Sequence, residues 1–171
     1  MAITAATWSR IDGIGLDQAI DATSSTQVYK AGMKIRCRDM SSTTERGEAT
    51  FQYAKGVASV VAGDMCVISP NNDAAVRTVA RSVGQLGVAM AAIVASNWGW
   101  FQVEGTAVCN VAASFADDRA VYLTATAGVV DDADAVVTGD LVYGARSAGA
   151  ISGSQALVDI RFPFAGDTDN S

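Results

Sequence analysis

Carboxylates are the side chains in this sequence whose spacing comes closest to a chemical site. Asp131, Asp132 and Asp134 stand close together, and Asp132 and Asp134 would project to the same side of an extended segment. Asp117 and Asp118 form a second pair. Calcium takes oxygen ligands, but it needs about six or more of them, and no EF-hand loop surrounds these acids. We therefore expect solvated turns and no metal site at either place.

Glu104 is the carboxylate that would enter a glycosidase mechanism, because two carboxylates can hydrolyse a glycosidic bond without histidine. Its partner would be an aspartate, but nothing in the sequence sets the distance between the two groups. A glutamate on the polar face of a strand is usually exposed to solvent. We expect Glu104 to be such a residue and keep a carbohydrate-active role as an alternative.

The sequence contains no histidine and only three cysteines. Catalysis by an imidazole base, by a Ser-His-Asp or Cys-His arrangement, and an ordinary zinc site are therefore excluded. Cys37, Cys66 and Cys109 are widely spaced and form no CxxC pair, which predicts reduced thiols packed as small apolar groups in a protein made in a reducing cytosol. The glycines match no phosphate-binding loop, so no cofactor is predicted.

The net charge and the hydrophobic pattern argue against nucleic-acid and membrane partners. The 171 residues include 12 basic and 18 acidic side chains, which gives a net charge of -6, and 50% are hydrophobic. A nucleic-acid-binding protein is expected to carry a basic face, so this balance argues against a nucleic-acid partner. Leu86–Ala95, the longest weakly polar stretch, covers about half of the ~20 residues that a membrane-spanning helix needs. Residues 1–8 lack the features of a secretory signal, so we expect no membrane partner either.

Alternation of apolar and polar residues predicts a strand over residues 28–39. Lys34, Arg36 and Arg38 fall on one face of this strand, and apolar side chains fall on the other. This basic stripe could contact an acidic partner, or it could be a solvated strand face balanced by neighbouring acids. The sequence leaves both interpretations open.

Short β runs alternate with turn signals through the rest of the chain. This pattern predicts an all-β fold with a β-barrel or β-sandwich body. Leu86–Ser96 is ambiguous between helix and strand, and Gly84 and Gly87 favour a strand. The other predicted strands are Glu48–Tyr53, Met65–Ser69, Val76–Val79, Trp98–Val108, Val121–Ala125 and 158–162.

The alternation also predicts which side chains face the core. Within Phe101–Val108 it places Gln102 outward, on the same side as Glu104. In the last strand it places Val158, Ile160 and Phe162 on one face, and Pro163 is expected to end the ladder.

The chain is predicted to have an extended N-terminal arm over residues 1–27, a β-rich body over 28–165 and a polar C-terminal tail over 166–171. Gly13 and Gly15 disfavour a helix in the arm.

A short internal similarity relates Val60–Val67 to Val136–Tyr143. Each has a Gly-Asp turn that leads into a strand. This similarity indicates two related halves of one barrel.

Several segments resemble a family of head proteins of tailed bacteriophages, the capsid decoration or cement proteins. The resemblance is carried by Gly47–Val57, Trp98–Val108, Ala120–Gly128 and the closing Arg161–Phe164, and it covers about residues 28–165. These motifs are structural and not catalytic. The resemblance implies a β-rich protein that sits, often as a trimer, on a lattice of the major capsid protein.

The resulting expectation is a non-enzymatic homotrimer on the capsid exterior of the virion. It would bind the major capsid protein and stabilise the head against internal DNA pressure. A spike or tail component is the first alternative, and a carbohydrate-binding or hydrolysing virion protein is the second. Contacts with the capsid or another subunit are predicted for the arm, the basic stripe and the tryptophan cluster, through Trp8, Ile11, Ile14, Leu16, Lys34, Arg36, Arg38, Trp98 and Trp100.

Overall fold

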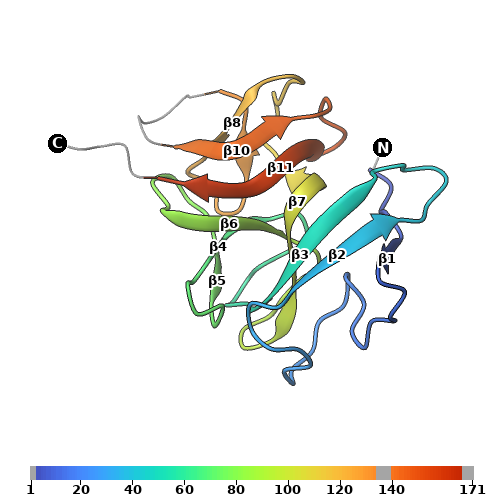
Figure 1. Ribbon diagram of the computed structural model, residues 1–171. Helices are drawn as coiled ribbons and strands as arrows, with labels where there is room; N and C mark the ends of the chain where they lie inside the picture. Colours follow the sequence, from blue (N-terminus) through green and yellow to red (C-terminus); the bar gives the residue numbers. More distant parts are fainter. Residues whose placement is uncertain (1–2, 134–139, 167–171) are drawn as a thin grey trace.

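The protein is all-β, as the sequence predicts. The computed structural model describes residues 3–133 and 140–166, and these contain eleven strands and no helix (Figure 1). The strands are β1 (Trp8–Arg10), β2 (Lys34–Asp39), β3 (Glu48–Lys55), β4 (Met65–Ile68), β5 (Ala75–Arg77), β6 (Gly84–Ala89), β7 (Trp98–Asn110), β8 (Ala120–Leu123), β9 (Val130–Asp131), β10 (Leu141–Ser147) and β11 (Gln155–Ala165).

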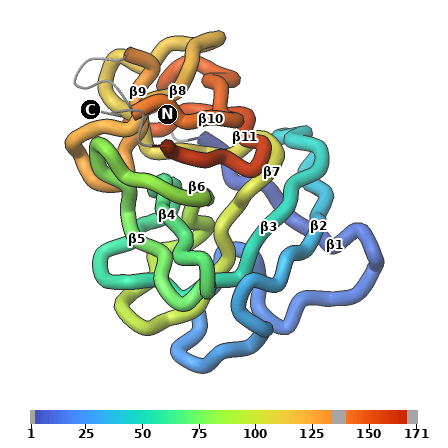
Figure 2. The backbone as a smooth tube through the Cα atoms, turned by 60° about the vertical axis from the view of Figure 1, so that its left-hand side comes forward, coloured from blue at the N-terminus to red at the C-terminus, as the bar shows by residue number. Residues whose placement is uncertain are grey.

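The strands form one antiparallel sheet that folds over itself. Its order is β1-β2-β3-β7-β6-β11-β10-β8-β9, with β4 and β5 attached beside β6. β6, β7 and β11 each pair with the other two, so the sheet turns back on itself where they meet (Figure 2). The long strands β7 and β11 can take part in this arrangement because each changes its partner part-way along its length.

The body contains one five-strand unit twice, with β7 shared between the two copies. In the first unit β3 pairs with β7, β7 with β6, β6 with β4, and β4 with β5. In the second unit β7 pairs with β11, β11 with β10, β10 with β8, and β8 with β9. Two isolated parallel bridges also correspond, Gly56 with Ala75 in the first unit and Val111 with Val130 in the second.

Each unit is built around an apolar core, and the second core also takes in Met65, Leu86 and Val88 from strands of the first unit. Equivalent positions are buried in both, such as Val60 and Phe115 in the loops, and Ile68 and Leu123 at the strand ends. The first core is Ala54, Val60, Cys66, Ile68, Ala75, Ala89, Ile93, Phe101 and Val103. The second, larger core contains Met65, Leu86, Val88, Ala107, Cys109, Val111, Phe115, Val121, Leu123, Val130, Val142, Ala156, Val158, Ile160 and Ala165.

The structural repeat differs from the similarity seen in the sequence. Val60–Val67 leads into β4, and the described part of Val136–Tyr143 belongs to β10, whereas the counterpart of β4 is β8. Residues 136–139 lie outside the described residues. Asp64 and Asp140 share a local role, because both are buried before a strand and each accepts a backbone N–H. The two halves exist, but the Gly-Asp motif does not relate them.

The N-terminal segment contains no helix within residues 3–27, and it packs along the body through turns and one short strand. β1 pairs with β2, and Ile20 belongs to a third apolar cluster with Phe51, Tyr53 and Trp100. The strand predicted over residues 28–39 covers only Lys34–Asp39, because residues 28–33 are irregular and include a turn at Ala31-Gly32.

Most of the other predicted strands are present with small differences in their ends. β6 covers only the first part of the ambiguous Leu86–Ser96 segment, and residues 90–97 form a loop with an isolated bridge at Ile93. The prediction that Pro163 ends the last strand is wrong, because β11 continues to Ala165. Phe164 and Ala165 pair there with β6, since β11 has bent away from β7.

Candidate functional site

The predicted basic stripe lies on the solvent side of β2. Lys34, Arg36 and Arg38 are exposed, while Ile35 and Cys37 between them are buried. The alternation predicted from the sequence is therefore confirmed for this strand. The stripe faces away from the third apolar cluster, because successive side chains of a strand point to opposite faces.

Glu48 of β3 forms ion pairs with two of these three cations. Arg36 Nη2 lies 2.8 Å from Glu48 Oε2, and Arg38 Nη2 donates a hydrogen bond to Glu48 Oε1 at 2.9 Å. The bond from Arg38 is the main reason that the pKa of Glu48 lies below its ordinary value. Lys34 makes a different contact, with its Nζ 5.0 Å from the centre of the Phe162 ring. The stripe is thus partly a balanced strand face, and Lys34 joins it to an aromatic surface.

Three aromatic rings continue this side of the sheet. Phe162, Phe164 and Tyr143 expose 48%, 47% and 47% of their surfaces. Tyr143 of β10 stands directly opposite Phe164 of β11, and Phe164 in turn stands opposite Gln85 of β6. Half-exposed aromatic rings gathered on one face are typical of an interaction surface.

We call this surface the aromatic–basic face. It comprises the exposed side chains of β2, β3, β7, β10 and β11 on the outer side of the sheet, together with the amides that adjoin them. Its members are Lys34, Arg36, Arg38, Glu48, Gln52, Gln85, Glu104, Tyr143, Asp159, Arg161, Phe162 and Phe164.

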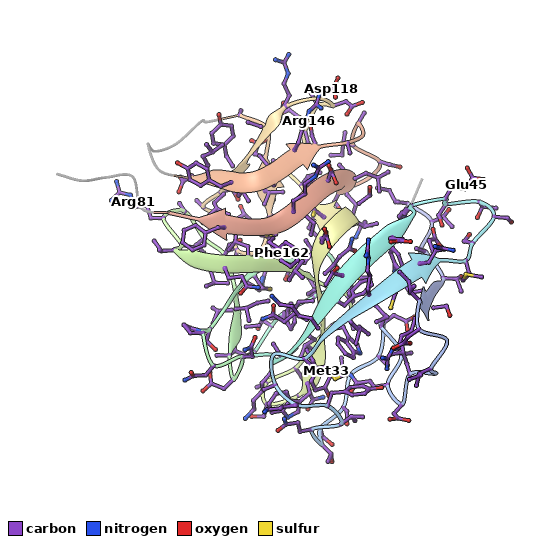
Figure 3. The ribbon with its side chains drawn as sticks, viewed as in Figure 1. Met33, Glu45, Arg81, Asp118, Arg146 and Phe162 are labelled. Atoms are coloured by element: carbon purple, nitrogen blue, oxygen red, sulfur yellow. The ribbon has the colours of Figure 1, made fainter. Side chains whose placement is uncertain are left out.

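Phe162 corrects a prediction. The alternation placed it on the buried face with Val158 and Ile160, but its ring points outward (Figure 3). The cause is a bend in β11 where Phe162 has a φ of 47° and the pairing with β10 shifts register. This bend reverses the alternation, so Pro163 is buried in place of Phe162. The run Phe162-Pro163-Phe164, with aromatic residues on either side of a proline, is the sequence signal that could have shown it.

Glu104 lies at a shallow charged depression on the same face. The depression is also lined by Arg36, Glu48, Asp159 and Arg161. Thr50 Oγ1 donates a hydrogen bond to Glu104 Oε2 at 2.6 Å. A glycosidase needs one carboxylic acid with a raised pKa, but the pKa of the neighbouring Glu48 is lowered by Arg38. Glu104 itself is half-buried and hydrogen-bonded, so it is not the fully exposed residue that the sequence predicts.

Gln102, predicted to point outward, is fully buried. In the sheet it stands opposite Phe51 of β3 and Val88 of β6, and its side chain faces the N-terminal segment. Its Nε2 donates to the backbone oxygen of Glu104 at 3.2 Å, which satisfies the buried amide. The prediction fails because both faces of β7 are covered here, one by the first core and the other by the N-terminal segment.

The predicted arm contacts divide into two groups. Trp8 packs its ring edge against Phe51, with ring centres 5.1 Å apart, and Leu16 packs on the third apolar cluster. Ile11 and Ile14 remain 44% and 63% exposed. Trp8 and Leu16 thus hold the segment to the body, and Ile11 and Ile14 are the ones free to contact a partner.

Gln18 fixes the same segment from inside. Tyr53 Oη donates to Gln18 Oε1 at 2.7 Å, and Gln18 Nε2 donates to the backbone oxygens of Ala22 and Trp98 at 2.9 and 3.2 Å. Trp100 Nε1 donates to the Gln18 backbone oxygen at 3.3 Å. Sequence reasoning missed Gln18, since a glutamine in a polar segment gives no signal of burial.

Trp100 is a correction among the predicted contact residues. Its side chain is fully buried between Tyr53 and Tyr29, so no part of it is available to a partner. Trp98 is half-buried and stacks on Tyr53 with ring centres 5.7 Å apart. The tryptophan cluster therefore belongs mainly to the core of the N-terminal region.

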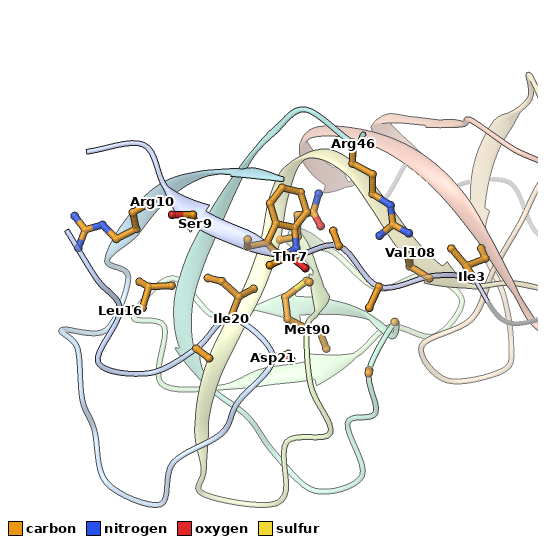
Figure 4. Close-up of a pocket in the computed structure, with 18 of the residues that line it drawn as sticks. Ile3, Thr7, Ser9, Arg10, Leu16, Ile20, Asp21, Arg46, Met90 and Val108 are labelled. Atoms are coloured by element: carbon orange, nitrogen blue, oxygen red, sulfur yellow. The ribbon is translucent and has the colours of Figure 1, made fainter. Parts of the chain in front are cut away.

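A cavity of about 540 Å³ lies between the N-terminal segment and the body. Ile3, Leu16 and Ile20 line it from the segment, and Met90 and Val108 line it from the body (Figure 4). Its lining also includes polar and charged residues, among them Arg10, Asp21, Arg46 and Gln102.

The predicted acidic turns are solvated or paired. Asp118 accepts a hydrogen bond from Arg146 at 2.7 Å, and both side chains are exposed. Burial raises the pKa of Asp131, and the adjacent Asp132 adds to this. Asp134 lies outside the described residues. Among the described residues no group of three or more potential metal ligands gathers.

The three cysteines are buried free thiols, which confirms the prediction that they pack as small apolar groups. Burial raises the pKa of Cys37 to about 11 and that of Cys109 to about 12. It also raises the pKa of Cys66. Protonated, enclosed thiols are poor nucleophiles, so these residues act through packing.

Comparison with known proteins adds no family. No protein-family model matches the chain, and no curated protein matches it either. In the part of the chain that the structure describes, no helix is long and apolar enough to cross a membrane.

Proposed function

We propose that this chain is a structural protein of a tailed-phage head, which binds the exterior of the capsid lattice and stabilises the shell against internal DNA pressure. In this proposal it associates with itself, as a homotrimer, and with the major capsid protein. It acts in the virion by contact and carries out no reaction there.

The distribution of exposed apolar side chains carries this proposal. Ile11 and Ile14 project from the N-terminal segment, and Phe162, Phe164 and Tyr143 project from the aromatic–basic face. Meanwhile the thiols are enclosed and the charged groups of the face are largely paired. Exposed apolar groups on a fully formed β body favour binding to other protein surfaces.

The resemblance to phage decoration proteins gives the second support. Its segments correspond to β3, β7, β8 and the end of β11. These strands form the sheet and its bend, so the resemblance concerns the whole body and not one loop. Many copies binding an assembled lattice would stabilise it by mass action, even where each contact is weak.

The copy number in purified virions tests the proposal. We expect the protein in a number comparable to that of the major capsid protein, measured from band intensities on a stained gel. A spike or tail component would be present in few copies. Absence from virions, or a few copies per particle, would contradict the proposal.

A binding assay on heads that lack the protein tests the contact residues. Ile14→Ser should lower the occupancy of added protein, and Val76→Ser, which removes a comparably exposed side chain from β5, should not. Point variants are needed because removal of residues 1–20 would also remove Gln18 and Ile20 from the interior. Restored heads should withstand heating longer than bare heads.

A further inference from the structure

Two exposed surfaces lie on opposite sides of the β2–β3 layer. The aromatic–basic face lies on the outer side, where Lys34 contacts Phe162. Residues 11–21, which we call the acidic loop, lie on the inner side, where Leu16 and Ile20 pack against the third apolar cluster. A single chain therefore presents the two surfaces in different directions.

The ring of Phe162 is held outward at a cost. Its φ of 47° lies in the left-handed region, where a residue with a side chain is strained. In the first unit the equivalent bend is at Gly105, with a φ of 95°, and glycine adopts this conformation without strain. A phenylalanine at such a bend, with 48% of its surface exposed, points to a role outside the monomer.

The two surfaces have opposite charge. The aromatic–basic face carries four cations and three anions in a chain of net charge -6, so the acidic excess lies elsewhere. The acidic loop carries Asp12, Asp17 and Asp21. Of these, Asp12 pairs with Arg10, and no ion pair is found for the other two among residues 3–133 and 140–166.

Both surfaces also expose apolar side chains next to their charged groups. Ile11 and Ile14 project from the acidic loop close to Asp12 and Asp17, and on the face the exposed ring of Phe162 lies beside Lys34. An aromatic or aliphatic centre bordered by complementary charges is typical of a specific protein contact.

We propose that the acidic loop of one copy docks on the aromatic–basic face of a second copy. Ile11 and Ile14 pack on Phe162 and Phe164, while Asp17 approaches Lys34. The contact is heterologous, so each chain gives its loop to one neighbour and its face to another, and repetition can close a ring. The inference rests on the self-association within the proposed function and names the surfaces that perform it.

Complementation between two variants tests the contact with purified protein and no capsid. The face variant combines Phe162→Gly with Lys34→Glu, and the loop variant combines Ile14→Ser with Asp17→Lys. We expect the wild type to self-associate in sedimentation velocity, and each variant to weaken this association at least tenfold. An equimolar mixture should form a one-to-one heterodimer, because one intact loop and one intact face remain between the two chains.

Val76→Ser is the matched control, since it removes an exposed apolar side chain outside both surfaces and should leave association unchanged. Circular dichroism and thermal unfolding establish that each variant is folded. High salt should weaken the wild-type assembly, because the paired charges are near the surface.

Three results would overturn the inference: a wild type that stays monomeric up to about 100 μM, where a micromolar contact is saturated; folded variants that still assemble; or a mixture that stays monomeric. Normal copy number in virions combined with any of these would leave the capsid role standing and remove this interface. Absence from virions combined with successful complementation would contradict the capsid role and leave this interface standing.

Discussion

The two long strands β7 and β11 bend at equivalent places, yet the residues at the two bends differ completely. At Gly105 an added Cβ would lie 2.6 Å from the backbone oxygen of Glu48, because β3 passes directly over the bend. At Phe162 the ring reaches solvent and Lys34. Each strand must bend because its two halves pair with different neighbours. The bend is thus a requirement of the repeat, and the side chain there depends on what covers it.

The largest change in stability is expected when a side chain is added at Gly105, the bend that β3 covers. Gly105→Ala should reduce the free energy of unfolding by about 4 kcal/mol or more, because the new Cβ meets backbone and φ is positive. Gly47→Ala is the matched control: φ is 73° and nothing lies within 4 Å, so only about 1 kcal/mol should be lost. Chemical denaturation measures both. Equal losses would mean that contact with β3 does not matter at this bend.

The cores of the two units provide a second contrast. Phe115 and Val60 occupy equivalent buried positions, but Phe115 fills the larger core. Phe115→Ala should cost about 3–4 kcal/mol and Val60→Ala about 2 kcal/mol, since the loss grows with the cavity left behind. Denaturant midpoints at unchanged slope would measure the difference. A larger loss at Val60 would show that the first core, and not the second, dominates stability.

The N-terminal region has no counterpart in the repeat, and Asp39 connects it to the body. Burial acts to raise the pKa of Asp39, but hydrogen bonds from the Thr44 hydroxyl and from the N–H groups of Ser41, Arg46 and Thr7 outweigh it and lower this pKa. A carboxylate with a lowered pKa stabilises the folded state above its unfolded pKa, and this stabilisation is lost as pH falls through the folded value.

Replacement of this carboxylate should therefore change the response to acid. Asp39→Asn should lower the free energy of unfolding at neutral pH by about 1–2 kcal/mol, as for the loss of a capping carboxylate. Below about pH 4 the difference from wild type should shrink, because the wild-type carboxylate becomes protonated. Thermal unfolding from pH 7 to pH 3 measures this. A difference that is constant with pH would show that the charge of Asp39 is not what holds the turn.

The sequence was informative where a strand has one face in the core and one in solvent. β2 is the clearest case, since Ile35 and Cys37 are buried and their neighbours are exposed. The sequence misled at Gln102 because both faces of β7 are covered there, one by the first core and the other by the N-terminal segment. This packing is long-range and leaves no local pattern.

The candidate site shows the same limit. The basic stripe follows from alternation alone, but the aromatic part of the face depends on a bend that reverses alternation in β11. The repeat was also misassigned, because the Gly-Asp turns at Asp64 and Asp140 are alike in sequence while the equivalent strands are alike only in pairing and burial. Pairing partners are set by the whole sheet, so a short similarity could not reveal them.

The smallest change in stability is expected at Phe162, where the bend of β11 is exposed to solvent. It is also the sharpest test of the comparison between the two bends. In an ordinary strand, glycine is less stable than alanine by about 0.5–1 kcal/mol, because its unfolded chain has more freedom. At Phe162 the order should reverse. Phe162→Ala loses the ring and its contact with Lys34 but keeps a side chain at positive φ. Phe162→Gly loses the same ring and also removes the strain, so it should be the more stable of the two by about 1 kcal/mol. Denaturation of both variants at a concentration too low for association measures this difference. A glycine variant less stable than the alanine variant would show that Phe162 is unstrained, and its exposed ring would then need no explanation beyond the monomer.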